Sequence, residues 1–196
     1  MARSSISFNK LSILRVFCIV CMIAVPGYAT AAKKPTQYGL GKAITDSDIA
    51  AWNIDVSPNG NGLPVGKGSV TTGQAVFKDK CAVCHGPDGK AGTGFVGPQL
   101  VGGQGTLNSA TPIKTIGSFW PYATTIYDYI NRAMPYTKPQ SLTSSEVYSV
   151  TAYLLFLNDI VPENTVLDER SLPLVLMPNR NGFVGDPRPD VKKTTK

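Results

Sequence analysis

Cysteine and histidine are scarce in this sequence, and their scarcity excludes two classes of protein. His85 is the only histidine, and of the four cysteines only Cys81 and Cys84 lie beyond residue 31. A structural zinc site needs four ligands, usually from two cysteine pairs, so this chain is short of a zinc donor. A multi-bridge disulfide framework requires a short, cysteine-dense domain and is excluded as well.

Long apolar runs are also lacking. The apolar run at residues 16–25 falls short of the roughly 20 residues that span a bilayer as a helix, which disfavours an uncleaved anchor. Arg3, Lys10 and Arg15 precede this run and small residues surround Ala31, which is the pattern of a secretory signal peptide. We therefore expect cleavage near Ala31 and a periplasmic protein with no integral membrane segment after cleavage.

A strong excess of charge of one sign is missing too. Without the leader the chain has 16 basic and 13 acidic residues, a net charge of +3. No basic stripe is interleaved with aromatic residues, so a nucleic-acid partner is not expected.

What the sequence does contain is the motif CAVCH at residues 81–85. This C-x-x-C-H spacing is the signature of covalent haem c attachment. One helical turn separates the cysteines, so both sulfurs can form thioethers with the porphyrin vinyl groups while His85 binds the iron. The alternative, a thioredoxin-like redox pair, should begin a helix. Here the pair instead follows a helix-like stretch, residues 71–80, for which Thr71 or Thr72 is the expected cap.

The region after the motif resembles a class I cytochrome c. Gly97-Pro98-Gln99-Leu100 stands where that family has a Gly-Pro-x-Leu stretch. In the family, the proline carbonyl accepts the ring N–H of the iron-bound histidine, a partner that metal-bound histidines usually have. The resemblance assigns this role to Pro98 and implies an all-α fold whose helices pack around one covalently bound haem.

A sixth iron ligand is expected from one of the two methionines beyond the leader, Met134 and Met177. Met134 lies in a polar loop, is followed by proline, and precedes the last helix, which is where class I cytochromes carry the ligand methionine. Met177 falls after that helix, and a methionine is often only core filler. The predicted metal ligands are therefore His85 and Met134, with Met177 or an open position as the alternatives.

Two helices should form the scaffold of the haem site. In the first, Gly73, Phe77 and Cys81 share one face. The last begins with a capping box from Thr143 to Glu146, and Asn158 with the nearby proline stops it. In class I cytochromes these helices cross, so the Gly73 face should meet the segment at residues 152–154.

Two further helices are predicted. One runs from Tyr122 to Ala133, with Pro121 suited to the first helical position, and leads directly into Met134. A short one covers Asp46 to Trp52.

The aromatic residues Trp120 and Tyr122 have two interpretations that the sequence leaves open. They bind a haem propionate through their polar tips, or they cover the haem edge as hydrophobic bulk. Lys114 and Arg132 are candidate counter-charges for the propionates, although most surface cations have no such role.

A more specific resemblance comes from two distant stretches. The chain looks like the SoxD-type cytochrome subunit of sulfite and sulfur dehydrogenase complexes in two regions. The first comprises residues 117–125, 130–135 and 139–143, and the second is Leu176-Met177-Pro178-Asn179-Arg180-Asn181-Gly182-Phe183. The resemblance implies a molybdenum-cofactor oxidoreductase subunit as electron donor and a downstream cytochrome or oxidase as acceptor. A general carrier to a terminal oxidase and a haem enzyme with a labile sixth ligand are the alternatives.

The expected layout has four parts. They are a signal peptide (1–31), an N-terminal extension (32–67), a cytochrome c domain (68–160) and a C-terminal extension (161–196). The chain has one C-x-x-C-H motif and no internal repeat, unlike longer two-haem members of the SoxD type. An apolar patch from Leu172 to Met177 predicts that the first half of the C-terminal extension packs on the domain.

Overall fold

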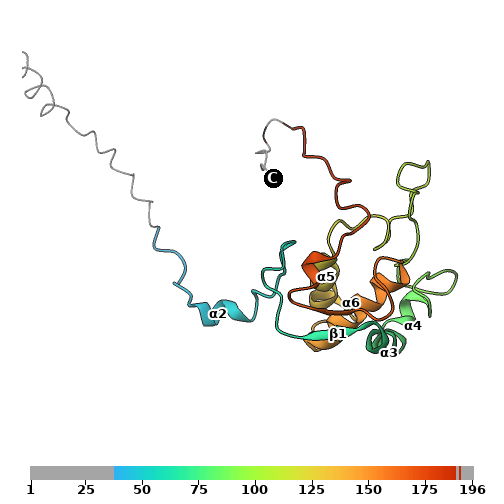
Figure 1. The fold of residues 1–196 in the computed structure, drawn as a ribbon. Coiled ribbons are helices and arrows are strands. Elements are labelled where there is room, and N and C mark those ends of the chain that lie inside the picture. The colour runs from blue at the N-terminus through green and yellow to red at the C-terminus, as the bar shows by residue number, and fades with distance from the viewer. Residues whose placement is uncertain (1–37, 189, 191–196) are drawn as a thin grey trace, which may run out of the picture. The chain divides into compact units, whose positions relative to one another are not determined.

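The computed structural model describes residues 38–188 and 190, so the predicted signal peptide lies outside the described residues. Its regular elements are helices and one short antiparallel ribbon, joined by long loops (Figure 1). Its elements in chain order are α2 (Asp46–Ala50), β1 (Lys67–Ser69), α3 (Val70–Lys80), α4 (Ala82–His85), α5 (Ala123–Ala133), α6 (Ser144–Leu157), β2 (Val166–Asp168) and the 3-10 turn η1 (Leu172–Leu174). No helix among these residues is long and apolar enough to cross a membrane.

Helices α3 and α6 cross closely at a glycine. Gly73 is buried on α3, and a Cβ atom there would lie 1.9 Å from the backbone oxygen of Ser149 on α6. One turn later, the Phe77 ring packs against Tyr153 with 5.5 Å between ring centroids. The predicted crossing of the Gly73 face with the last helix is therefore confirmed.

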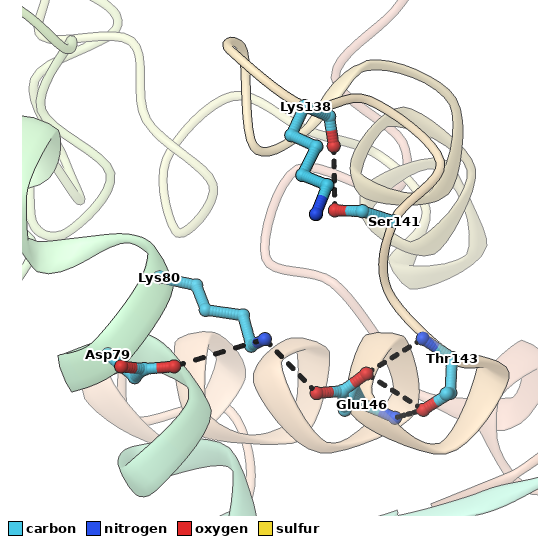
Figure 2. Close-up of polar contacts among 6 residues, drawn as sticks. All are labelled: Asp79, Lys80, Lys138, Ser141, Thr143 and Glu146. Atoms are coloured by element: carbon cyan, nitrogen blue, oxygen red, sulfur yellow. Dashed lines mark hydrogen bonds and ion pairs between the residues drawn. The ribbon is translucent and has the colours of Figure 1, made fainter.

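The start of α6 is fixed by the predicted capping box. The Glu146 N–H donates to Thr143 Oγ1 (3.3 Å), and the Thr143 N–H donates to Glu146 Oε2 (2.8 Å). Figure 2 shows that Lys80, the last residue of α3, also reaches this carboxylate, with 3.6 Å between Lys80 Nζ and Glu146 Oε1. The capping box fixes the start of α6, and the ion pair connects the end of α3 to it.

Three predicted helix boundaries were wrong. Helix α3 is capped by Ser69, whose Oγ accepts from the Thr72 N–H (3.1 Å), so Thr71 and Thr72 lie inside the helix. Ser69 is also the last residue of β1, and its extended backbone gives it the geometry of a cap.

Pro121 is not the first residue of α5, because the extended Tyr122 is the N-cap and the helix begins at Ala123. Helix α2 ends at Ala50, and Trp52 lies in the following turn, 83 % exposed. A short helix without a buried face has no packing to extend it.

The first half of the C-terminal extension packs on the domain, as predicted. Strand β2 pairs with β1 in antiparallel register, Lys67 opposite Asp168 and Ser69 opposite Val166. Leu172 is fully buried and Met177 is 3 % exposed, and both belong to the main hydrophobic core.

Candidate functional site

The CAVCH motif occupies the junction of two helices. Cys81 follows α3, and α4 is a single turn whose amide at His85 donates to the Cys81 carbonyl (3.1 Å). Both cysteines are half-buried, and His85 is 8 % exposed. The α3–α6 crossing therefore holds the motif in place through α3.

The ring of His85 is oriented by a backbone carbonyl. Its Nδ1 lies 2.8 Å from the carbonyl oxygen of Pro98, the contact that the resemblance implied. A carbonyl can only accept, so Nδ1 carries the proton and donates it, which leaves the lone pair on Nε2 for a metal. A metal-binding imidazole usually has this tautomer, with the other ring nitrogen donating its N–H to a fixed acceptor.

Gly97 allows this close approach. Its N–H donates to the Cys84 carbonyl (2.9 Å), and a Cβ atom at Gly97 would lie 2.7 Å from His85 Nδ1. Only glycine lets the loop lie flat against the imidazole ring here.

The loop that carries Pro98 is held by Asn158, the C-cap of α6. Asn158 is 3 % exposed; its Oδ1 accepts from the Gly102 N–H (3.0 Å) and its Nδ2 donates to the Leu100 carbonyl (3.3 Å). Gln104 Nε2 donates in turn to the Asn158 carbonyl (3.1 Å). From the sequence we predicted Asn158 only as a helix stop. Its one local signal is a polar side chain directly after an apolar helix.

The thiols do not have the properties of a redox pair. Burial raises the pKa of the Cys81 thiol to about 11, and the neighbouring Cys84 adds to the shift. A reactive pair needs a lowered pKa, so the thioredoxin-like alternative is disfavoured. Among the described residues, no three histidine, cysteine, aspartate or glutamate side chains are arranged to hold a metal ion.

The two candidate methionines differ in environment. Met134 directly follows α5 as its C-cap and is half-buried, whereas Met177 is 3 % exposed and packed in the hydrophobic core. Burial in the core gives Met177 a structural role as filler. Met134 also packs against this core, so Met134 as the sixth iron ligand stays a prediction.

The proposed propionate residues are only partly available. Trp120 and Tyr122 are half-buried just before α5, and the Trp120 ring packs edge-on against Tyr129 (5.7 Å between centroids). Arg132 is committed elsewhere, because its Nε donates to Asp128 Oδ1 (3.0 Å) and this hydrogen bond raises the pKa of the guanidinium. Arg132 is therefore a poor candidate for a counter-charge.

Comparison with known proteins places this site in a family. The cytochrome c family model matches residues 70–158, which include the motif, Pro98 and Met134. The chain is 42 % identical to a chain in the crystal structure of the sulfane dehydrogenase SoxCD from Paracoccus pantotrophus, with a TM-score of 0.72, covering 78 % of this chain and 74 % of that one. The chain belongs to the cytochrome c family.

This cytochrome c is also similar to a thiosulfate dehydrogenase from Stutzerimonas stutzeri (strain A1501). The two are 33 % identical over 94 residues, which are 46 % of this chain and 28 % of that protein. The chain thus spans little more than a quarter of the length of that relative.

Membership of the cytochrome c family implies covalently bound haem c, and the residues present fit that group. Cys81 and Cys84 supply two thiols one helical turn apart, and His85 supplies an imidazole whose Nε2 is available. Partly buried apolar side chains that pack against the core would cover a porphyrin, among them Ala82, Leu100, Trp120 and Met134.

Proposed function

We propose that this cytochrome c is a periplasmic carrier with a single haem that accepts electrons one at a time from a molybdenum-containing subunit oxidising a sulfur compound. A downstream cytochrome or oxidase would take the electrons. The likeness to a chain of SoxCD supports the donor, because the match extends well beyond the family core at residues 70–158. The single C-x-x-C-H motif supports the count of one haem.

The observation that carries the proposal is the hydrogen bond from His85 Nδ1 to the Pro98 carbonyl. It fixes the tautomer, prevents rotation of the ring and makes Nε2 a stronger donor. Cys81 and Cys84 would hold the porphyrin through thioethers, and Met134 would supply the sixth ligand.

Bound haem c supplies a one-electron couple whose potential depends on its axial ligands and on burial. The chain provides a rigid frame for that couple: the loop at residues 97–104 is held by Asn158, and α5 presents Met134 at its end. A frame that moves little keeps the reorganisation on electron transfer small. No acid, base or nucleophile is required of the protein.

The proposal is tested with the exported, purified protein. Its mass should include one haem, and the haem should be reduced under anaerobic conditions by a molybdenum sulfite or sulfur dehydrogenase only when the sulfur substrate is present. The Cys84→Ser variant serves as the control, because it loses one thioether bond. A colourless protein without added mass would refute the haem assignment, and a red protein that the dehydrogenase does not reduce would refute the donor.

A haem enzyme that converts thiosulfate is the second candidate, and the similarity to the thiosulfate dehydrogenase favours it. Such an enzyme needs a labile sixth ligand and a distal acid or base, yet His85 is the only histidine and is assigned to the iron. Rapid carbon monoxide binding by the ferrous protein at neutral pH would favour this candidate. Slow or absent binding supports the carrier.

A further inference from the structure

A short segment ahead of β1, residues 44–53, forms a regular helix without packing on the rest of the described chain. We call it the N-terminal arm. Helix α2 opens the arm with a capping box and has no buried residue. The amides of Trp52 and Asn53 both donate to the Ile49 carbonyl (2.8 and 2.9 Å), so helical hydrogen bonding continues past the end of α2.

One face of the arm is apolar. Ile44 directly precedes the N-cap Thr45, and Ile49 is four residues beyond it, which are the two positions that pack together in a hydrophobic staple. Trp52 follows Ile49 by three residues and falls on the same side of a helix. The three apolar side chains are 68 %, 39 % and 83 % exposed. No part of the described chain therefore covers this face.

An apolar face of this kind indicates a contact with another surface. A helix this short is marginal in water on its own, because most helical stability in proteins comes from the packing of an apolar face. Contiguous exposed apolar side chains mark interaction sites. Partner proteins bind such helices by enclosing the apolar face in a hydrophobic groove. The arm thus has the form of a docking segment.

The chain that follows the arm is fixed to α5. Val56 is 8 % exposed, and its N–H donates to Asp128 Oδ1 (2.8 Å). Close by, Thr124 Oγ1 donates to the Pro58 carbonyl (3.1 Å). Only residues 54 and 55 separate the arm from this attachment. A partner that holds the arm is therefore kept close to the folded domain.

The likeness to a chain of SoxCD reaches back to the arm. A match over 78 % of this chain has to begin at or before about residue 45, even if it continues to the last residue. The cytochrome c family model begins only at residue 70. The arm lies outside the family core but within the region that resembles a sulfane dehydrogenase.

We propose that the N-terminal arm docks in an apolar groove of the molybdenum-containing donor subunit, with Ile44, Ile49 and Trp52 facing the groove. The inference rests on the proposed function, which supplies the donor. Three side chains bury far less than the roughly 1,000 Å² of a specific interface, so the arm alone holds neither a donor nor a second copy of the chain. It adds to the contact at the haem, because linking two weak contacts makes the second one intramolecular.

The first test measures haem reduction in the full-length holoprotein by a molybdenum sulfite or sulfur dehydrogenase with its substrate, as the dehydrogenase concentration is varied. In Trp52→Ser the concentration that gives half the maximal rate should rise by about tenfold or more, because an aromatic anchor is lost. The rate at saturating dehydrogenase should stay unchanged, because the haem site is intact. Ile49→Ser should act in the same direction.

Two control variants keep the kinetic result interpretable. Ser47→Ala changes α2 on the side opposite the apolar face, and Leu176→Ser removes an apolar side chain that is 80 % exposed in the C-terminal extension. Neither should change the half-saturating concentration. An equal effect of Leu176→Ser would mean that surface hydrophobicity in general drives binding, and it would overturn the inference. Trp52 is exposed, so the serine variants should keep the wild-type melting temperature.

The second test needs no variant. Hydrogen exchange at the amides of Trp52 and Asn53 should be fast in the free holoprotein and slow once the dehydrogenase is added. Protection in the free protein at every protein concentration would mean that the arm packs on its own domain. Protection that grows with protein concentration would mean that a second copy covers it. Either result overturns the inference.

The inference and the proposed function fail in different ways. If the dehydrogenase reduces the wild type and both serine variants with the same half-saturating concentration, the inference is overturned and the proposed function stands. A wild-type haem that the dehydrogenase does not reduce at any concentration defeats the proposed function, and the inference with it.

Discussion

At the scale of single residues, the site depends on His85 being held rather than merely present. Its ring is buried, its Nδ1–H donates a hydrogen bond to the Pro98 carbonyl, and Gly97 lies where any side chain would press on the ring. These three conditions concern three different residues, and the contribution of Pro98 comes from its backbone carbonyl.

The first prediction concerns the sixth ligand. Met134→Ala should leave haem attached, because the thioethers and His85 are unchanged, but should abolish the weak red-edge sulfur-to-iron absorption of the ferric protein. Absorption spectroscopy of the oxidised protein measures it. Met177→Leu is the matched control and should keep the band, because Met177 is a buried core residue. The reverse pattern would make Met177 the ligand.

Sequence reasoning located these residues well where the information is local or carried by a family motif. The predicted contact between His85 and the Pro98 carbonyl is present, whereas Met134 as the sixth ligand stays a prediction. The sequence did not assign Asn158 to the loop or Arg180 to the aromatic segment ahead of α5. The contacts of Asn158 and of Arg180 join positions 54 to 58 residues apart in the sequence, and such a separation leaves no periodic signal in the chain.

At the scale of elements, the α3–α6 crossing is the most extensive contact between two elements of the described residues. Its prediction succeeded because glycine and aromatic spacing on a helix is a local pattern. The helix starts were predicted less well: Ser69 belongs to a strand that exists only because β2 returns to pair with it. A cap defined by a distant strand cannot be found from neighbouring residues alone.

The second prediction tests this crossing. Gly73→Ala should destabilise the protein by about 3 kcal/mol, because the new methyl group would overlap the Ser149 backbone and force the helices apart. Denaturant unfolding of the holoprotein gives the change in midpoint. Gln74→Ala, on the exposed face of the same helix, should stay within about 0.5 kcal/mol. Equal losses of stability in the two variants would mean that the close approach of the helices at Gly73 does not limit what fits there.

The third prediction concerns acid stability. The Thr143 N–H, more than the nearby Lys80, holds the pKa of Glu146 below its usual range in the folded state. The stability that this carboxylate provides is therefore fully present above its unfolded pKa and is lost as the pH falls through the lower folded pKa. Glu146→Gln should flatten the stability profile between neutral and acid pH. Urea unfolding across that range measures it, and a profile as steep as that of the wild type would contradict it.

At the scale of the whole molecule, the described C-terminal extension is part of the folded domain and not an appendage. Strand β2 belongs to the ribbon, Leu172 and Met177 belong to the core, and Asn179 donates a hydrogen bond to the Phe119 carbonyl ahead of α5. The match to a chain of SoxCD covers 78 % of this chain, which is more than the family core.

The fourth prediction compares two truncations. A chain that ends after Arg170 loses the buried Leu172 and Met177, so its unfolding free energy should fall by at least about 4 kcal/mol. A chain that ends after Val184, which is 92 % exposed, should match the full-length protein. Thermal unfolding of both holoproteins gives the result. A stable shorter chain would show that the extension merely rests on the surface.

The antiparallel register of the ribbon has a mechanical consequence. Lys67 faces Asp168, so both extensions leave the ribbon at the same end. A stretching force applied across them would load the strand pairs one after another, like a zipper, from Lys67 and Asp168 toward Ser69 and Val166. Ser69 also caps α3, so separation of the strands would end at the first turn of α3, the helix that leads to Cys81.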